Sequence, residues 1–110
     1  MAKYLFVETR DPFEHRDCDS FYELVQGVVA EGNQARLFLI QNGVLPARKG
    51  NRYSEVIDKL AQSEVKIHVD PFSLRERGIQ RSNLINQIKV SEFQDLVSWM
   101  LEPGTKIVWH

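Results

Sequence analysis

The segment Val65–Gly78 reads VKIHVDPFSLRERG and decides how the rest of the chain is interpreted. Its first part, Val65–Val69, is rich in β-branched residues, which is typical of a buried strand. Asp70 and Pro71 follow as a dipeptide typical of a turn, and the basic stretch after them predicts a short helix. A strand that passes through a sharp turn into a helix is a basic unit of an α/β domain.

Four further apolar runs predict strands on either side of this segment. Tyr4–Val7 and Leu37–Ile40 are continuous apolar runs, as in strands that are covered on both faces. Ile88–Val90 predicts a short fourth strand, and Thr105–Trp109 predicts the last one. Strands separated by helices favour parallel pairing through right-handed crossovers. We therefore predict an α/β fold, a three-layer α/β/α sandwich with a mainly parallel five-stranded sheet.

Helices with one apolar face are expected between these strands. The first is predicted to begin at Ser20, the N-cap of a capping box, and to end at Gly32. The second is predicted from Ser54, and the third follows a second capping box at Ser91. No linker, internal repeat or low-complexity tract interrupts the series. Residues 1–110 are therefore expected to form a single domain.

The composition is that of an ordinary globular protein. Of the 110 residues, 43% are apolar and 26% are charged. The 14 basic and 15 acidic residues give a net charge of −1, which does not favour binding to nucleic acid. No apolar run approaches the roughly 20 residues that span a bilayer, so no membrane association is expected. The single cysteine, Cys18, fits a reducing compartment, and we expect a cytoplasmic protein.

Three segments of the chain are informative when taken together. They are Leu37–Val44 (LFLIQNGV), Leu74–Ile79 (LRERGI) and Ile88–Phe93 (IKVSEF). In this order and spacing they resemble the DsrE/DsrF-like family, which includes the sulfur-relay subunits of the Tus and Dsr systems. The resemblance implies a parallel sheet with the last strand beside the first. It also implies assembly into a homo-oligomer, or a hetero-oligomer with sulfur-relay subunits.

The same resemblance draws attention to a missing cysteine. Active members of the family carry a cysteine at the end of the third strand, where it accepts a persulfide and hands it on. Counting back from Gly78, this position is Asp70, and Ser73 stands at a second position that is sometimes cysteine. The relay needs a polarizable thiolate, and a hydroxyl without an adjacent base is a poor nucleophile. The resemblance therefore implies a non-carrier member: an accessory, scaffold or ligand-binding protein.

Ligands of open parallel sheets bind outside the carboxyl ends of the strands. At this edge the residues predicted to bind a ligand are Asn42, Arg48, Asp70, Ser73 and Arg75. Basic residues cluster on two of the loops there and can bind a small anion. They are Arg48, Lys49 and Arg52 on one loop and Arg75, Arg77 and Arg81 on the other. A solvated rim or a partner-docking surface is the simpler interpretation of these charges, and a turn or helix cap is the simpler interpretation of Asp70. The alternative function is thus a module that binds an anionic metabolite or a protein partner, unrelated to sulfur chemistry.

Cys18 is a weak candidate for a catalytic residue because it is the only thiol. It is expected in the first loop, either as a reactive thiol facing Asp70 or as an ordinary loop cysteine. The second interpretation is favoured because no activating base is paired with it. His15 and Cys18 offer only two metal ligands, so neither a metal nor a cofactor is predicted. Asp70 as a general base has no partner residue, and no independent catalytic activity is expected.

Overall fold

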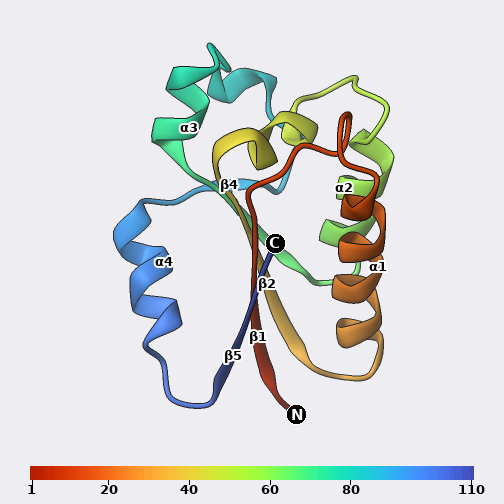
Figure 1. The fold of residues 1–110 in the computed structure, drawn as a ribbon, viewed down its shortest axis with the longest axis vertical. Helices are drawn as coiled ribbons and strands as arrows, with labels where there is room; N and C mark the ends of the chain where they lie inside the picture. The colour runs from red at the N-terminus through yellow and green to blue at the C-terminus, as the bar shows by residue number, and fades with distance from the viewer.

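The computed structural model describes residues 1–110 and contains one five-stranded sheet in which every neighbouring pair of strands is parallel (Figure 1). The strand order is β4-β3-β2-β1-β5, so the last strand does lie beside the first. The strands are β1 (Lys3–Glu8), β2 (Gln34–Leu39), β3 (Lys66–Val69), β4 (Lys89–Val90) and β5 (Thr105–Trp109). The predicted fold class is confirmed.

Helices cover both faces of the sheet and crowd its carboxyl edge. Helices α1 and α2 lie on one face, and α4 lies on the other (Figure 1). Short helices, including α3 and η1, follow the ends of the central strands and cover the carboxyl edge. The helical segments are α1 (Asp17–Ala30), η1 (Gln41–Ala47), α2 (Ser54–Gln62), α3 (Pro71–Glu76), η2 (Arg81–Asn83) and α4 (Phe93–Met100). None of them combines the length and apolar character needed to cross a bilayer.

The two faces of the sheet bury very different amounts of apolar surface. The main core has 18 buried residues and fills the space beneath α1 and α2. The core beneath α4 has only five, because one short helix covers that face: Leu5, Val7, Phe38, Ile40 and Leu96. In the register of the sheet Leu5 pairs with Ile107 and Val7 with Trp109. Ile107 and Trp109 therefore lie on the α4 face, where both remain exposed.

Helices α1 and α4 do not have the N-caps that the sequence patterns predict, Ser20 and Ser91. Helix α1 begins at Asp17, so Ser20 lies inside its first turn and does not cap it. Acidic side chains at Asp17 and Asp19 favour this earlier start, because they lie at the positive end of the helix dipole. The prediction of a capping box at Ser20 is wrong.

The capping box of α4 is shifted by one residue, from Ser91 to Glu92. Glu92 and Asp95 exchange side-chain and backbone hydrogen bonds at the start of this helix. Ser91 is engaged elsewhere: its N–H donates to the carbonyl of Val69 (3.0 Å), and its Oγ lies 2.8 Å from Nδ1 of His68. Because Ser91 continues the contacts of the sheet, the next residue caps the helix.

Candidate binding site at the carboxyl ends of the strands

Asp70 lies where β3 ends and α3 begins, and its side chain is buried. Its Oδ2 accepts hydrogen bonds from the backbone N–H of Ser73 (2.9 Å) and from the hydroxyl of Ser73 (2.7 Å). The Ser73 hydroxyl oxygen in turn accepts from the N–H of Gln41 at 2.7 Å. Asp70 is thus the N-cap of α3 and links it, through Ser73, to the end of β2. Ser73 itself lies inside the helix.

Asn42 and Arg77 form the outer part of the same site. Nε of Arg77 donates to Oδ1 of Asn42 (2.9 Å), and Nη1 donates to the carbonyl of Ser73 (3.1 Å). These residues line a cavity of about 620 Å³ together with two exposed aromatic side chains, Phe72 and Phe93. Arg77 supplies a positive charge that can pair with an anionic group. The lining contains neither cysteine nor histidine, and its charged side chains are Asp70, Glu76 and Arg77.

The five residues predicted to bind a ligand do not all meet. Asn42, Asp70 and Ser73 line one cavity, whereas Arg48 and Arg75 do not. Arg75 is exposed on α3. The Arg48 guanidinium donates to the carbonyl of Leu45 (2.8 Å) and lies 5.9 Å from the ring centre of Phe13. The positive charge in the cavity comes from another member of the predicted basic cluster, Arg77. Ligand binding by these residues stays a prediction.

Cys18 lies in the first turn of α1 and is fully buried. The loop position predicted for it is wrong, because the helix begins earlier than expected. Its Sγ donates to the carbonyl of Arg10 at 3.6 Å. Burial, with a further contribution from the nearby Glu8 carboxylate, raises the pKa of the Cys18 thiol to about 12. Since the thiolate is the nucleophile, this environment disfavours the reactive form of Cys18 at neutral pH.

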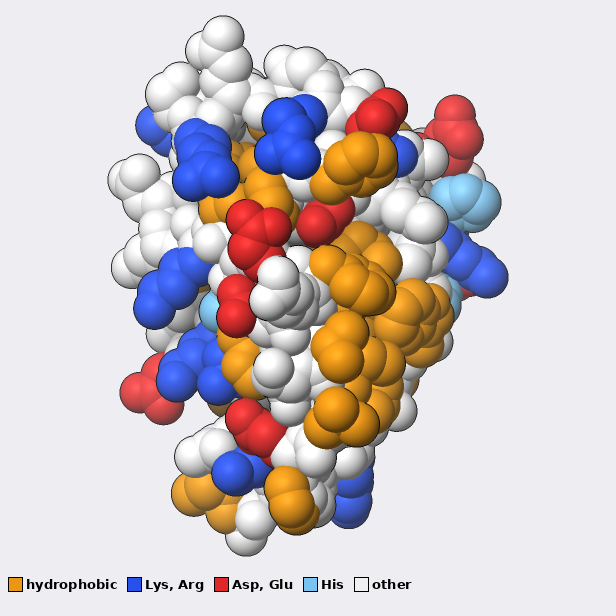
Figure 2. Space-filling model, turned by 90° about the vertical axis from the view of Figure 1, so that its left-hand side faces the viewer, with side chains coloured by type: hydrophobic (Ala, Val, Ile, Leu, Met, Phe, Trp, Pro, Cys, Tyr) orange, Lys and Arg blue, Asp and Glu red, His pale blue; other side chains and the backbone are white.

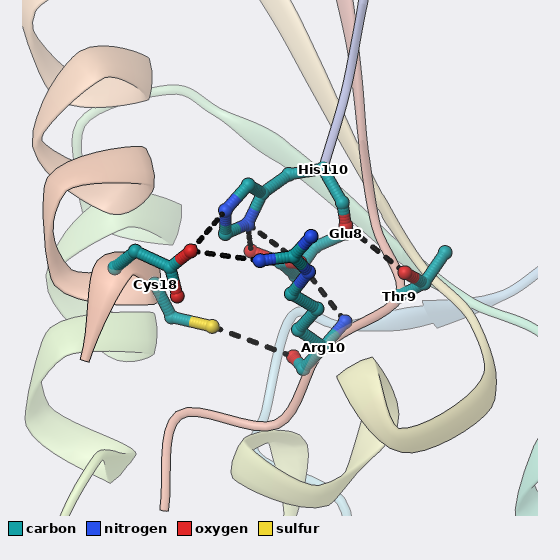
Figure 3. Close-up of polar contacts among 6 residues, drawn as sticks. Glu8, Thr9, Arg10, Cys18 and His110 are labelled. Atoms are coloured by element: carbon teal, nitrogen blue, oxygen red, sulfur yellow. Dashed lines mark hydrogen bonds and ion pairs between the residues drawn. The ribbon is translucent and has the colours of Figure 1, made fainter. Parts of the chain in front are cut away.

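The residues around Cys18 form a polar network that the sequence analysis did not single out (Figure 3). His110, directly after β5, places Nδ1 2.7 Å from Oε2 of the fully buried Glu8 at the end of β1. Its Nε2 lies 3.1 Å from Oδ2 of Asp17, which also accepts from Nη1 of Arg10 at 2.8 Å. The sequence did contain a signal for this network. Glu8 directly follows the predicted strand Tyr4–Val7, His110 directly follows the predicted strand Thr105–Trp109, and the resemblance places these two strands side by side.

This fold and site define a class of small α/β proteins that place their functional residues at the carboxyl ends of a parallel sheet. Within that class, the chain belongs to the DsrE/DsrF-like family, whose model matches residues 2–109. The family is related to sulfur relay. The sequence resemblance is therefore confirmed at the level of the family.

Relatives at the sequence level include two archaeal proteins. The uncharacterized protein MJ0989 of Methanocaldococcus jannaschii is 23% identical over 113 residues, which cover 97% of this chain and 99% of the relative. The uncharacterized protein MK0008 of Methanopyrus kandleri is 24% identical over 85 residues, or 72% of this chain and 70% of the relative.

Solved structures show the same fold. The ychN protein from E. coli superposes with a TM-score of 0.91 at 18% identity, with both chains covered completely. MTH1491 from Methanobacterium thermoautotrophicum, titled a protein of unknown function, superposes with a TM-score of 0.85 at 17% identity, also over both whole chains. At these identities the likeness establishes the architecture alone.

Proposed function

We propose that this protein is a non-carrier member of an intracellular sulfur-transfer system. It would serve that system as an accessory, scaffold or ligand-binding subunit. The observation that carries the proposal is the hydrogen bonding of Asp70, which occupies the family's cysteine position. Its carboxylate caps α3 through Ser73 and has no capacity to hold sulfane sulfur. The remaining thiol, Cys18, is buried and protonated at neutral pH, so it does not replace the missing carrier.

The cavity at Asp70 supports a binding role in place of a carrier role. Arg77 holds a positive charge at its rim, fixed by Asn42 and by the carbonyl of Ser73. Phe72 and Phe93 border the same cavity and are exposed. A cation in a cavity that exposed aromatic rings also line suits an anionic group presented by a ligand or by a partner protein.

The α4 face supports assembly with further subunits. Figure 2 shows a continuous band of hydrophobic side chains along this side of the molecule. Exposed apolar residues there come from α3, α4 and β5: Phe72, Phe93, Val97, Leu101, Ile107 and Trp109. Contiguous apolar surface of this kind marks an interaction site. Another copy of this chain, or a related sulfur-relay subunit, is the partner we propose for it.

A sulfur-loading experiment tests the main proposal. The purified protein is incubated with a low-molecular-weight persulfide donor and analysed by intact-mass spectrometry under non-reducing conditions. The proposal predicts no added sulfur, because Asp70 replaces the carrier cysteine and Cys18 is buried. Stoichiometric sulfur on Cys18 would overturn it.

The second candidate function is a module for an anionic metabolite, without any link to sulfur. The observation that favours it is Arg77, the cation that lies in the Asp70 cavity. Thermal-shift measurements with phosphate, nucleotides and sulfur oxyanions separate the two functions. Stabilisation by a nucleotide that is lost in Arg77→Ala and kept in Arg75→Ala would favour the second. Arg75 is the matched control because it is an exposed arginine of α3, two residues before Arg77, and lies outside the cavity.

A further inference from the structure

Three side chains with different donor atoms converge beneath the amino-terminal end of α1. Glu8 ends β1, Cys18 lies in the first turn of α1, and His110 follows β5. A carboxylate oxygen, the thiol sulfur and an imidazole nitrogen all lie within 4.8 Å of one another. Figure 3 shows the imidazole of His110 facing Glu8, with the Cys18 side chain nearby and its sulfur directed toward the Arg10 carbonyl. Residues from both ends of the chain are thus brought together by the parallel pairing of β1 with β5.

The charge balance of this cluster favours a bound cation. Glu8 is fully buried, and a buried carboxylate needs a positive partner because transfer from water is costly. One of its oxygens accepts from the backbone N–H of Arg10 (2.9 Å), and the other faces Nδ1 of His110 at 2.7 Å. A lone pair on Nδ1 cannot face a carboxylate oxygen at that distance unless a proton or a metal ion lies between them. A divalent metal ion held by Glu8, a neutral His110 and the Cys18 thiolate leaves the cluster as neutral as a proton on His110 does, so the charge balance accommodates either cation.

We propose that Glu8, Cys18 and His110 form a binding site for a divalent transition metal ion of the Zn²⁺ type. Sulfur, nitrogen and carboxylate oxygen are the donors that Zn²⁺ takes in proteins. Asp17 supports this role because its Oδ2 lies 3.1 Å from Nε2 of His110. A carboxylate that accepts from one ring nitrogen fixes the tautomer that offers the other nitrogen, Nδ1, to the metal.

A second observation points to a ligand at this place. Tyr22 lies one turn after Cys18 in α1, and its hydroxyl is buried without any hydrogen-bond partner. Side chains of a helix lean toward its amino terminus, which directs this hydroxyl toward the level of Cys18. Burial raises the pKa of Tyr22, and Cys18 and Glu8 are the next largest causes. A water molecule that fills the fourth position of the metal would give this orphan hydroxyl a partner.

The distances in the cluster are close to those of a tetrahedral site. With metal–ligand bonds of about 2.0–2.3 Å, ligand atoms lie roughly 3.3–3.8 Å apart. The Glu8 Oε2–His110 Nδ1 pair, 2.7 Å apart, must open by roughly 0.6–0.8 Å, and no two of the three ligand atoms are more than 4.8 Å apart. On binding, Cys18 forms an S–metal bond and releases its proton to solvent, so no oxidant or reductant is involved.

Titration of the purified protein with metal tests this site. The protein is first treated with a chelator, and Zn²⁺ binding is then measured by calorimetry and Co²⁺ binding by absorption spectroscopy. We expect one ion per chain and a near-ultraviolet thiolate-to-Co²⁺ charge-transfer band. Cys18→Ser is expected to abolish the band, and Glu8→Gln and His110→Gln to weaken Zn²⁺ binding at least about tenfold. Zn²⁺ should also raise the melting temperature of the native protein.

His15→Gln is the matched control, because His15 is exposed three residues before Cys18 and lies outside the cluster. It should bind Zn²⁺ as the native protein does. Tyr22→Phe keeps the fold because it removes a hydroxyl without partners, and it should weaken binding less than Glu8→Gln does. Absence of binding by the native protein, or a Co²⁺ spectrum without the thiolate band, would overturn the proposal. The metal titration and the sulfur-loading experiment measure different properties, so the metal site can be refuted while the non-carrier role stands, and the reverse.

Discussion

Asp70 and a cysteine at the same position would serve different chemistry. A cysteine offers a polarizable nucleophile, whereas the carboxylate of Asp70 offers two strong acceptor oxygens. Both hydrogen bonds that it accepts come from Ser73, one from the backbone and one from the hydroxyl. The side chain is thereby committed to holding α3 at the end of β3. Asp70 therefore has a structural role at the edge of the sheet, and it lacks the sulfur atom that a carrier residue needs.

Replacing Asp70 by alanine should destabilise the protein. The change removes the cap of α3 and leaves the N–H and hydroxyl of Ser73 without their acceptor. Loss of an N-cap carboxylate typically costs about 1–2 kcal/mol in the free energy of unfolding. Urea unfolding followed by circular dichroism measures it. Arg75→Ala, an exposed change in the same helix, should cost less than about 0.5 kcal/mol, and equal losses in the two variants would contradict the cap role.

His68 should make the stability of the protein depend on pH. It is buried in β3, with its ring centre 4.5 Å from that of Trp99. Nη1 of Arg36 lies 3.5 Å from Nε2, which makes Nε2 the acceptor and Nδ1–H the donor to Ser91. Burial, and then the positive charges of Arg36 and two neighbouring lysines, lower the pKa of His68 to about 4 against a slight opposite effect of Asp95.

The sign of this dependence follows from which state binds the proton. Unfolded His68 takes up a proton below about pH 6.5, and folded His68 does so only near pH 4. The free energy of unfolding should therefore fall as the pH drops through this window, by on the order of 2–3 kcal/mol. Unfolding curves at several pH values measure the slope. His68→Gln should flatten the slope and the exposed control His15→Gln should not; identical slopes in all three proteins would contradict the assignment.

Among the elements, η1 is held unusually close to the end of β1. The Glu8 carbonyl accepts from the N–H of Ile40 (3.1 Å) and lies directly against Gly43. A Cβ atom at Gly43 would overlap the backbone carbonyl of Glu8, which cannot move without disturbing the sheet. The glycine of the Leu37–Val44 segment is therefore required for close approach of two backbones.

Gly43→Ala should be strongly destabilising, by about 2–3 kcal/mol or more, because overpacking against a backbone is not relieved by a rotamer change. Thermal and urea unfolding measure the effect. Gly27→Ala is the control, since that glycine lies in α1 with open space around it. Alanine favours a helix, so Gly27→Ala should be neutral or stabilising by up to about 1 kcal/mol. Similar behaviour of the two variants would argue against the close packing of η1 on β1.

Apolar periodicity predicts the elements of this chain well because burial imposes it on every strand and helix. Helix starts were less predictable, since they depend on competition for hydrogen bonds, as Ser91 illustrates by pairing with His68. In the candidate site, Asn42, Asp70 and Ser73 could be grouped because parallel strand ends meet at one edge. That Arg77 and not Arg75 lines the cavity could not be predicted, because it depends on where the short helix α3 ends: Arg75 lies inside the helix, and Arg77 is its C-cap.

At the scale of the whole molecule, the two faces of the sheet are covered unequally, and the face under α4 leaves apolar side chains exposed to solvent. Helix α4 is the single helix on its face; Phe93 and Val97 on this helix and Leu101 directly after it are exposed apolar residues one turn apart. Leu101 is 77% exposed and Trp109, on the edge strand β5, is 52% exposed. Burying this band between subunits would complete the second core.

The proposed assembly predicts a solution oligomer that depends on this band. Light scattering coupled to gel filtration should give more than one subunit for the native protein. A Val97→Glu and Leu101→Glu double variant should dissociate at the same concentration, because it places charges in the apolar interface. Leu24→Glu is the control, since Leu24 is a similarly exposed leucine on the opposite helical layer. A native monomer, or equal dissociation in the control, would contradict the assembly.

Sulfur loading of Asp70→Cys beside the native protein tests the central claim most directly. The variant places a thiol at the position that the resemblance equates with the carrier cysteine, in a cavity that Arg77 also lines. After exposure to the same persulfide donor, intact-mass spectrometry should show sulfur added to Asp70→Cys and none added to the native chain. Peptide mapping should place that sulfur at position 70, with Cys18 unmodified in both proteins. Stoichiometric sulfur on Cys18 of the native protein would contradict the account.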